Sequence, residues 1–212
     1  EKIIEGFLGL NAVSIILILL AIFVFIGVTG ARFFFAPEVG FSDFFLSTEW
    51  NPLAFGEAEW GVLNLVLGTL FIGLGALGLA IPLGVATAIY LSQLAGERTR
   101  EIFKPIFEMI AAIPSVVLGL FGLLVLAPLF SDLFGLPNGL NAFTASILVG
   151  FMALPTIISI SEDAITGVPK SYKQASYALG ATRLETIQKV VLPAAKSGII
   201  ASIMLGFGRV IG

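Results

Sequence analysis

The stretch QASYALGATRLETIQKVVLP, residues 174–193, decides how this chain is interpreted, because it concentrates charge in an otherwise apolar sequence. Two capping-box patterns mark it: Ser171 precedes Gln174 by three residues, and Thr182 precedes Glu185 by the same spacing. In such a box the hydroxyl and the longer side chain each satisfy a backbone amide at the start of a helix. The spacing therefore predicts two short, separately capped helices.

Gly180 lies between the two predicted helices, where a chain leaving a helix commonly needs the positive φ that glycine adopts freely. Pro193 is predicted to end the second helix, because proline lacks a backbone amide donor. Apolar runs flank the segment on both sides, so we expect a compact helical hairpin between two membrane spans. Such a hairpin presents a docking element on one side of the membrane.

Composition identifies lipid as the solvent of most of the chain. Mean hydropathy is +1.05 and only 12% of the residues are charged. Cysteine and histidine are absent from the sequence, which excludes disulfides, thiolate metal sites and the usual proton shuttle. Because catalytic motifs are missing too, we expect no enzyme activity, cofactor or metal. The net charge of −3 gives no reason to expect a nucleic acid partner.

Runs without charge locate the membrane spans, since a span needs about 20 apolar residues. The uncharged runs are 6–31, 60–96, 109–131, 133–161 and 197–208. They predict an all-α, polytopic membrane protein. One spanning helix is expected in an N-terminal part, residues 1–60, and the rest in a core, residues 61–212. The core helices are predicted at 61–94, 105–130, 141–161 and 198–212, with the hairpin at 162–197.

Individual residues refine these bounds. The second run would measure about 55 Å as a straight helix, so it is predicted to project beyond the lipid or to bend at Pro82. Pro105 suits the first turn of the next helix, and a turn sequence predicts a helix start near Asn141. The chain begins at Glu1 and ends at Gly212 within an apolar run, which favours a fragment of a longer protein.

Lysine and arginine predict the orientation, because cytoplasmic loops of membrane proteins carry an excess of these residues. The segments 95–104 and 162–197 are basic, whereas 32–59 and 131–141 hold only Arg32. The N-terminus and the hairpin are therefore predicted to face the cytoplasm.

The exterior segment 32–60 is acidic and dense in aromatic residues. Its acidic and aromatic residues include Phe35, Glu38, Phe55 and Glu57. The composition predicts an interfacial or re-entrant element at headgroup level. An acidic exterior fits a protein docking surface better than a funnel for anions.

Several residues near the lipid receive a structural interpretation. Glu108 is predicted to pair with Lys104 at a helix start, and Glu162 and Asp163 to mark only the water boundary. Small residues recur at every fourth position: Ala80, Gly84 and Ala88. Such a stripe allows helices to approach closely, and packing within one bundle is favoured over a subunit interface.

Arg209 receives a functional interpretation. Its helix places it about 18 Å beyond the last preceding charge, deep in the bilayer. A guanidinium at that depth costs about 3 kcal/mol on insertion scales unless it faces a wet or polar interior. A role in the substrate pathway is favoured over snorkelling or a structural ion pair. The planar fork of arginine also suits a doubly charged oxyanion.

The hairpin resembles the "EAA" loop of ABC importer permeases: Glu-Ala-Ala, three residues, Gly, nine residues, an aliphatic, one residue, Leu-Pro. Matching positions are Ala175, Gly180, Val190, Leu192 and Pro193. Gln174 stands where the family usually has Glu, and Ser176 replaces the second Ala. The resemblance implies that Gln174, Ala175, Gly180, Ala181, Leu192 and Pro193 form a loop that couples to ATPase subunits.

Four further stretches make the chain similar to the PstC-type permease of the phosphate-specific ABC importer: FFLSTEWNP (44–52), and segments 68–92, 104–128 and 178–199. The family's fifth core helix carries Arg, two residues, Gly, Glu, and here Arg209 and Gly212 fit. A Glu one residue later would lie within pairing reach of Arg209.

The resemblance implies a type I importer permease (MetI-like) fold, truncated here, in the cytoplasmic (inner) membrane. Implied partners are a PstA-type second permease, two cytoplasmic ATPase subunits and an exterior phosphate-binding protein. Permeases for sulfate/molybdate or phosphonate remain alternatives, because the hairpin binds the ATPase and does not contact the substrate. An ion-coupled secondary transporter is a weaker alternative, since it would need acids or histidines within the membrane.

The orientation can be tested with single cysteines in this cysteine-free chain. We expect Thr99→Cys and Ser171→Cys to react with an impermeant maleimide only from the cytoplasmic side, and Ser47→Cys only from outside. Intact cells and inverted vesicles give the two readings. Labelling of Ser171→Cys on intact cells would overturn the predicted orientation.

Overall fold

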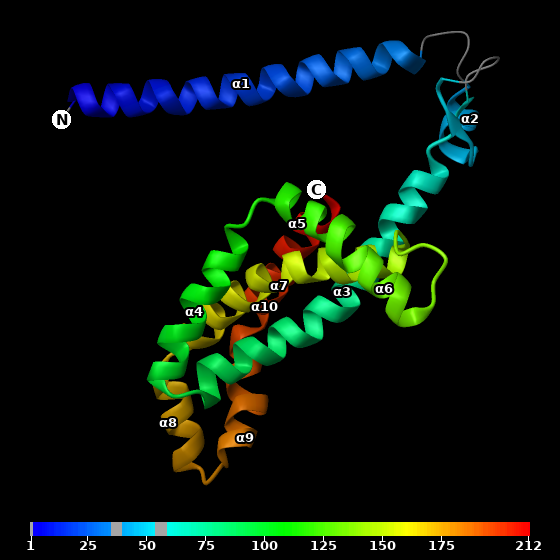
Figure 1. The fold of residues 1–212 in the computed structure, drawn as a ribbon. Coiled ribbons are helices and arrows are strands. Elements are labelled where there is room, and N and C mark those ends of the chain that lie inside the picture. The colour runs from blue at the N-terminus through cyan, green and yellow to red at the C-terminus, as the bar shows by residue number, and fades with distance from the viewer. Residues whose placement is uncertain (1, 35–39, 54–58) are drawn as a thin grey trace. The chain divides into compact units, whose positions relative to one another are not determined.

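The computed structural model describes residues 2–34, 40–53 and 59–212, most of which are helical (Figure 1). The chain divides into two compact units, 1–67 and 68–212. Five helices in the described part are long and apolar enough to cross a membrane: Ile4–Phe33, Leu63–Leu94, Ser115–Phe134, Ala142–Thr166 and Arg183–Ile211. The predicted all-α, polytopic fold class is confirmed.

The first unit contains α1 (Lys2–Phe34), α2 (Phe41–Leu46) and the antiparallel strands β1 (Trp50–Asn51) and β2 (Glu59–Trp60). Trp50 pairs with Trp60 across the strands, and their rings meet edge to face with centroids 5.8 Å apart. The ring of Phe33 lies 5.1 Å from that of Trp60. Of the predicted exterior element, Phe35, Glu38, Phe55 and Glu57 lie outside the described residues.

The remaining elements follow in chain order: α3 (Leu63–Ile89), α4 (Glu97–Ala111), α5 (Ser115–Phe121), α6 (Ala127–Phe134), α7 (Ala142–Thr166), α8 (Lys170–Ala178), α9 (Arg183–Thr186) and α10 (Leu192–Ile211). Three π-helical turns connect some of them: η1 (Tyr90–Leu94), η2 (Gly122–Leu126) and η3 (Ile187–Val191). Asn141 caps α7 by accepting a hydrogen bond from the Thr144 amide at 3.0 Å, which confirms the predicted helix start.

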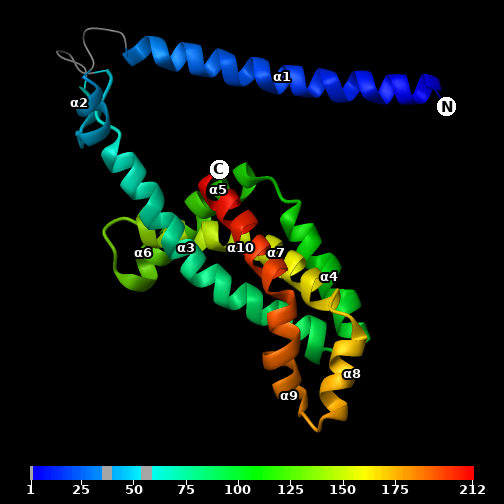
Figure 2. The same cartoon turned by 180° about the vertical axis from the view of Figure 1, so that it is seen from behind.

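Helix α7 is central in the second unit. It packs along α10, and it also contacts α4, α5 and η1. Figures 1 and 2 show α7 and α10 side by side from opposite directions, with α8 and α9 together at one end. The elements that position the candidate site therefore share α7 as a common support.

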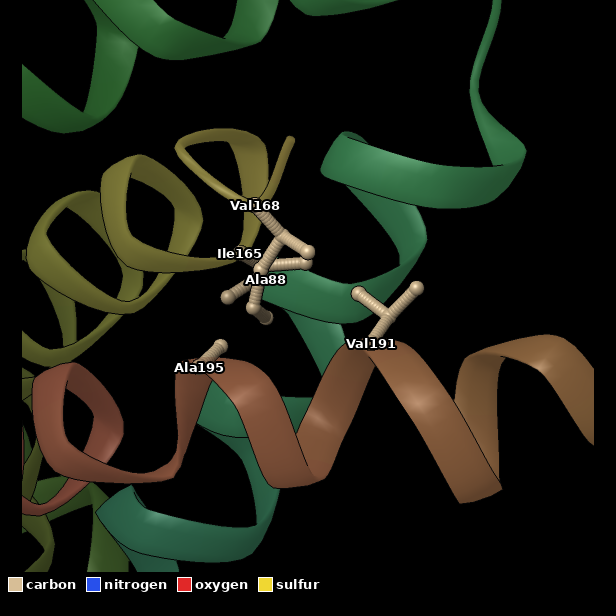
Figure 3. Close-up of a cluster of buried hydrophobic side chains, with 5 residues drawn as sticks. All are labelled: Ala88, Ile165, Val168, Val191 and Ala195. Carbon is tan, nitrogen blue, oxygen red and sulfur yellow. The ribbon is translucent and has the colours of Figure 1, made fainter. Parts of the chain in front are cut away.

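Two buried clusters join α3 to its neighbours. One consists of Ala80 on α3 with Ala153 and Ile157 on α7. The other contains Ala88, Ile165, Val168, Val191 and Ala195, which converge from α3, the end of α7 and the turn after it, η3 and the start of α10 (Figure 3). Gly84 lies between them on α3, where an added Cβ would come within 2.8 Å of Ile157. The small-residue stripe thus packs within one bundle, as predicted.

The prediction of one helix over 105–130 is wrong. Helix α4 begins at Glu97 with Pro105 inside it, and the spanning helix begins only at Ser115. Pro114 explains the break, because proline disfavours helical conformation in the preceding residue and caps the next helix with φ −58° and ψ 134°. Helix α4 is amphipathic, which separates it from the uniformly apolar spans.

The close approach of α3 and α7 yields a stability prediction. A Cβ added at Gly150 would meet the backbone oxygen of Ala76 at 2.9 Å, whereas a Cβ at Gly78 meets nothing within 4 Å. We expect Gly150→Leu to destabilise the fold by about 1–3 kcal/mol and Gly78→Leu, the matched control on α3, to do so much less. Thermal unfolding in detergent measures both. Equal effects would contradict the packing of α3 on α7.

Candidate functional site

The hairpin of α8 and α9 is fixed by backbone and side-chain caps. Gly180 has φ 83°, its amide donates to the Tyr177 carbonyl at 2.9 Å, and the Ala181 amide donates to Ser176 at 3.2 Å. This pair of bonds is the Schellman ending of a helix. Thr182 and Glu185 then form the predicted capping box, with the Thr182 amide 3.0 Å from Glu185 Oε2. Both predictions for the turn are confirmed.

A buried hydrogen bond holds the two arms of the hairpin together. The hydroxyls of Ser176 on α8 and Thr186 on α9 lie 2.9 Å apart, and both side chains are buried. Removed from water, two hydroxyls that satisfy each other fix the spacing of the arms. The hairpin is therefore a stiff element.

The capping box predicted for Ser171 and Gln174 is wrong. Helix α8 begins at Lys170, and Pro169 precedes it with φ −55° and ψ 135° and no side-chain cap. The fixed φ of proline sets the helix entry, and its carbonyl accepts the Tyr172 amide at 3.1 Å. Ser171 and Gln174 are thus exposed residues within the helix.

Pro193 does not end the second helix, contrary to the prediction. Residues Arg183–Ile211 form one continuous helix through α9, η3 and α10, with Pro193 in the first turn of α10. In η3 the Leu192 amide donates to Ile187, five residues back. The wider π turn gives the proline ring room against the preceding turn. The second arm of the hairpin is thus the same helix as the last span.

A hollow of about 650 Å³ lies against the hairpin. Its walls include Ala175, Gly180 and Ala181, three of the six predicted coupling residues. Leu192 packs instead against the cluster of Figure 3, and Pro193 is exposed beside it. The structure therefore brings together only part of the predicted set. Leu179, which the sequence analysis passed over, projects from the turn with 90% of its surface exposed.

Arg209 lies near the end of α10, where its guanidinium is held by two neutral acceptors. Nη1 donates to Thr156 Oγ1 on α7 at 3.2 Å, and Nη2 donates to the carbonyl oxygen of Ala111 at 2.9 Å. Within the described residues the guanidinium forms no ion pair with a carboxylate. The side chain is partly buried.

The sequence analysis did not predict the ion pairs of Glu162. Its side chain is 2% exposed, and its oxygens accept from Arg100 Nη2 at 2.6 Å, Lys104 Nζ at 3.0 Å and Thr166 Oγ1 at 2.8 Å. Lys104 also pairs with Asp163 at 2.6 Å. Lys104 therefore pairs with acids of α7, not with Glu108, and Glu162 does more than mark the water boundary.

The sequence shows the four charges of this cluster but not which of them pair. Arg100 and Lys104 are four residues apart on one helix face, opposite two adjacent acids at the end of a predicted span. The hydrogen bond to Asp163 raises the pKa of Lys104, with smaller contributions from Glu162, while burial opposes the rise. The ammonium therefore stays protonated at neutral pH.

Comparisons with known proteins identify the family of the chain. Residues 80–212 match the family described as the binding-protein-dependent transport system inner membrane component. This chain belongs to that family. The family and the five apolar helices identify it as a multi-pass protein of the inner membrane.

The relatives include transport permeases, several of them named PstC. The probable ABC transporter permease protein YqgH of Bacillus subtilis is 36% identical over 99% of this chain and 68% of its own length. The phosphate transport system permease protein PstC of Pasteurella multocida is 36% identical over 82% of this chain and 59% of its own length. PstC 2 of Mycobacterium tuberculosis is 31% identical over 95% and 66%, respectively. The chain thus spans about three fifths to two thirds of these curated relatives, and the predicted resemblance is confirmed.

The turn of the hairpin gives a testable prediction. Valine at position 180 would have to adopt the left-handed conformation, at a cost of about 1–2 kcal/mol or more, although the space around the glycine is open. We expect Gly180→Val to reduce ATP-dependent uptake and co-purification with ATPase subunits in the full-length protein. Gly180→Asn is the matched control, because asparagine tolerates this conformation. Equal loss in both variants would show that side-chain bulk, not backbone conformation, matters.

Proposed function

We propose that this chain is the permease subunit of an ABC importer for inorganic phosphate. Two cytoplasmic ATPase subunits would grip the hairpins of two permeases, this one and a PstA-type partner. An exterior phosphate-binding protein would deliver the substrate. The observation that carries the proposal is one continuous helix, Arg183–Ile211, which begins in the capped hairpin and bears Arg209 near its other end.

The hairpin supports the coupling part of the proposal. Its turn is closed by the Schellman bonds of Gly180 and Ala181, and its arms by the hydroxyl pair of Ser176 and Thr186. A stiff element displaces what it is attached to, and α9 continues through η3 into α10. Closure of the ATPases on ATP binding would therefore move α10 within the membrane.

Arg209 supports the substrate part. Among the described residues its guanidinium donates to a hydroxyl and a carbonyl, both neutral acceptors, and in this proposal it also binds the oxyanion. A planar fork binds two phosphate oxygens at once, which a lysine point charge does not. The names of the PstC relatives favour phosphate over sulfate/molybdate or phosphonate, which remain alternatives.

Substitution of Arg209 tests the substrate part of the proposal. We expect Arg209→Gln to abolish phosphate uptake while the complex still assembles, because an amide keeps the hydrogen bonding but not the charge. Arg209→Lys should restore uptake in part at best. Radiolabelled phosphate uptake is measured beside the amount of complex in the membrane, with the full-length protein and all subunits present.

Two results would count against this role. Full uptake by Arg209→Gln would remove the guanidinium from the substrate pathway. Loss of assembly would make Arg209 a structural residue, since the hydroxyl of Thr156 and the carbonyl of Ala111 would then lose a donor that the fold requires.

A further inference from the structure

Helix α4 is clamped onto α7 by the buried carboxylate of Glu162. Arg100 and Lys104 are one turn apart on α4, and both donate to this carboxylate, while Thr166 binds it from within α7. Glu162 is the only buried charged residue in the described part of the second unit. A carboxylate withdrawn from water requires such partners, so the geometry of α4 against α7 is fixed at this point.

The C-terminal end of α4 contacts Arg209. Ala111 is the last residue of α4, and its carbonyl accepts from the guanidinium at 2.9 Å. The second acceptor, Thr156, belongs to α7, about 9 Å before Glu162 along the helix axis. Arg209 therefore depends on the register of α4 against α7, which the contacts of Glu162 set.

Glu162 also lies where the hairpin is attached. Helix α7 ends at Thr166, one turn beyond Glu162, and α8 begins at Lys170. Because α8 is joined directly to the end of α7, a displacement of α8 would move Glu162 before the rest of the bundle.

We infer that Glu162 is a positioning residue for transport: it clamps α4 onto α7 and thereby holds the Ala111 carbonyl against Arg209. The inference rests on the proposed role of Arg209. A movement of the hairpin would then displace the guanidinium in two ways. It would act directly along α10, and it would act through Glu162 and α4. Glu162 does not touch the substrate, and its effect is on the geometry and coupling of Arg209.

The experiment uses Glu162→Gln in the full-length protein within its complete complex, with Asp163→Asn as the matched control. Asp163 is the neighbouring acid, bound to the same Lys104 but 61% exposed at its side chain. Spin labels on Met109→Cys of α4 and Phe151→Cys of α7, both exposed positions in a cysteine-free chain, report the distance between the helices. Phosphate imported per ATP hydrolysed reports coupling.

We expect one narrow distance in the parent and in Asp163→Asn, and a broadened distribution in Glu162→Gln. Phosphate imported per ATP should fall roughly fivefold or more in Glu162→Gln only. An unchanged distance in Glu162→Gln overturns the clamp, whatever the uptake. A broadened distance with normal uptake per ATP overturns the positioning role. If Glu162→Gln fails to assemble, Arg100→Gln, which leaves Lys104 on the carboxylate, is judged by the same criteria.

Different results would contradict the proposed function and the role of Glu162. Full uptake by Arg209→Gln would remove Arg209 from the pathway, yet the distance between the labels would still decide whether Glu162 fixes α4. Conversely, an unchanged distance in Glu162→Gln overturns the clamp and leaves the test of Arg209 intact.

Discussion

The close approach of α3 and α10 to α7 is the contact on which the second unit depends. Lipid supplies no hydrophobic force between helices, so packing and interhelical hydrogen bonds must hold them. Gly150 brings α7 against the α3 backbone, and an added Cβ at Gly206 of α10 would meet Ile157 at 2.7 Å. The hydroxyls of Ser161 and Ser202 add a buried bond of 2.6 Å between α7 and α10. Helix α7 thus serves as the fixed reference for the other elements.

The last helix begins in the capped hairpin and is interrupted by a π turn before it crosses the membrane. The capped turn at Gly180 and the close-packed arms make the hairpin rigid, whereas the π turn η3 interrupts the regular hydrogen bonding just above it. π turns and prolines are the usual places where helices bend, and here Pro193 directly follows η3. Val191 of η3 lies in the buried cluster of Figure 3, so the π turn packs against α3 and the end of α7. In the proposed function a movement of the hairpin would pass through this packed π turn to α10.

Local chemistry explains which features could be predicted from the sequence. The lipid-facing spans, the cap at Asn141, the positive φ of Gly180 and the box of Thr182 and Glu185 each follow from a few neighbouring residues. Pro193 was misjudged because a proline stops a helix only where the preceding turn cannot widen, and η3 widens it. The helix start at Glu97 was missed because a charged stretch was interpreted as a loop, although its charges lie on one face of an amphipathic helix.

The clamp could not be predicted for a different reason. Glu162 and Arg100 are far apart in sequence, and only the packing of α4 on α7 brings them within 2.6 Å. The sequence shows two acids at the end of a span and two bases on the previous segment, but the pairing depends on which helix faces which. Long-range contacts of this kind carry no periodicity or spacing that a single sequence displays.

Charge balance separates the clamp from Arg209. Glu162 and Asp163 are matched by Arg100 and Lys104, so the cluster is electrically neutral and would neither attract nor repel an anion strongly. Among the described residues, Arg209 in contrast donates to a hydroxyl and a carbonyl, neither of which carries a charge. In the proposed function this partly buried guanidinium would bind the oxyanion through its planar fork. The two charged sites that contact α7 thus differ: the acids of the clamp are paired with bases, whereas the acceptors of Arg209 among the described residues are neutral.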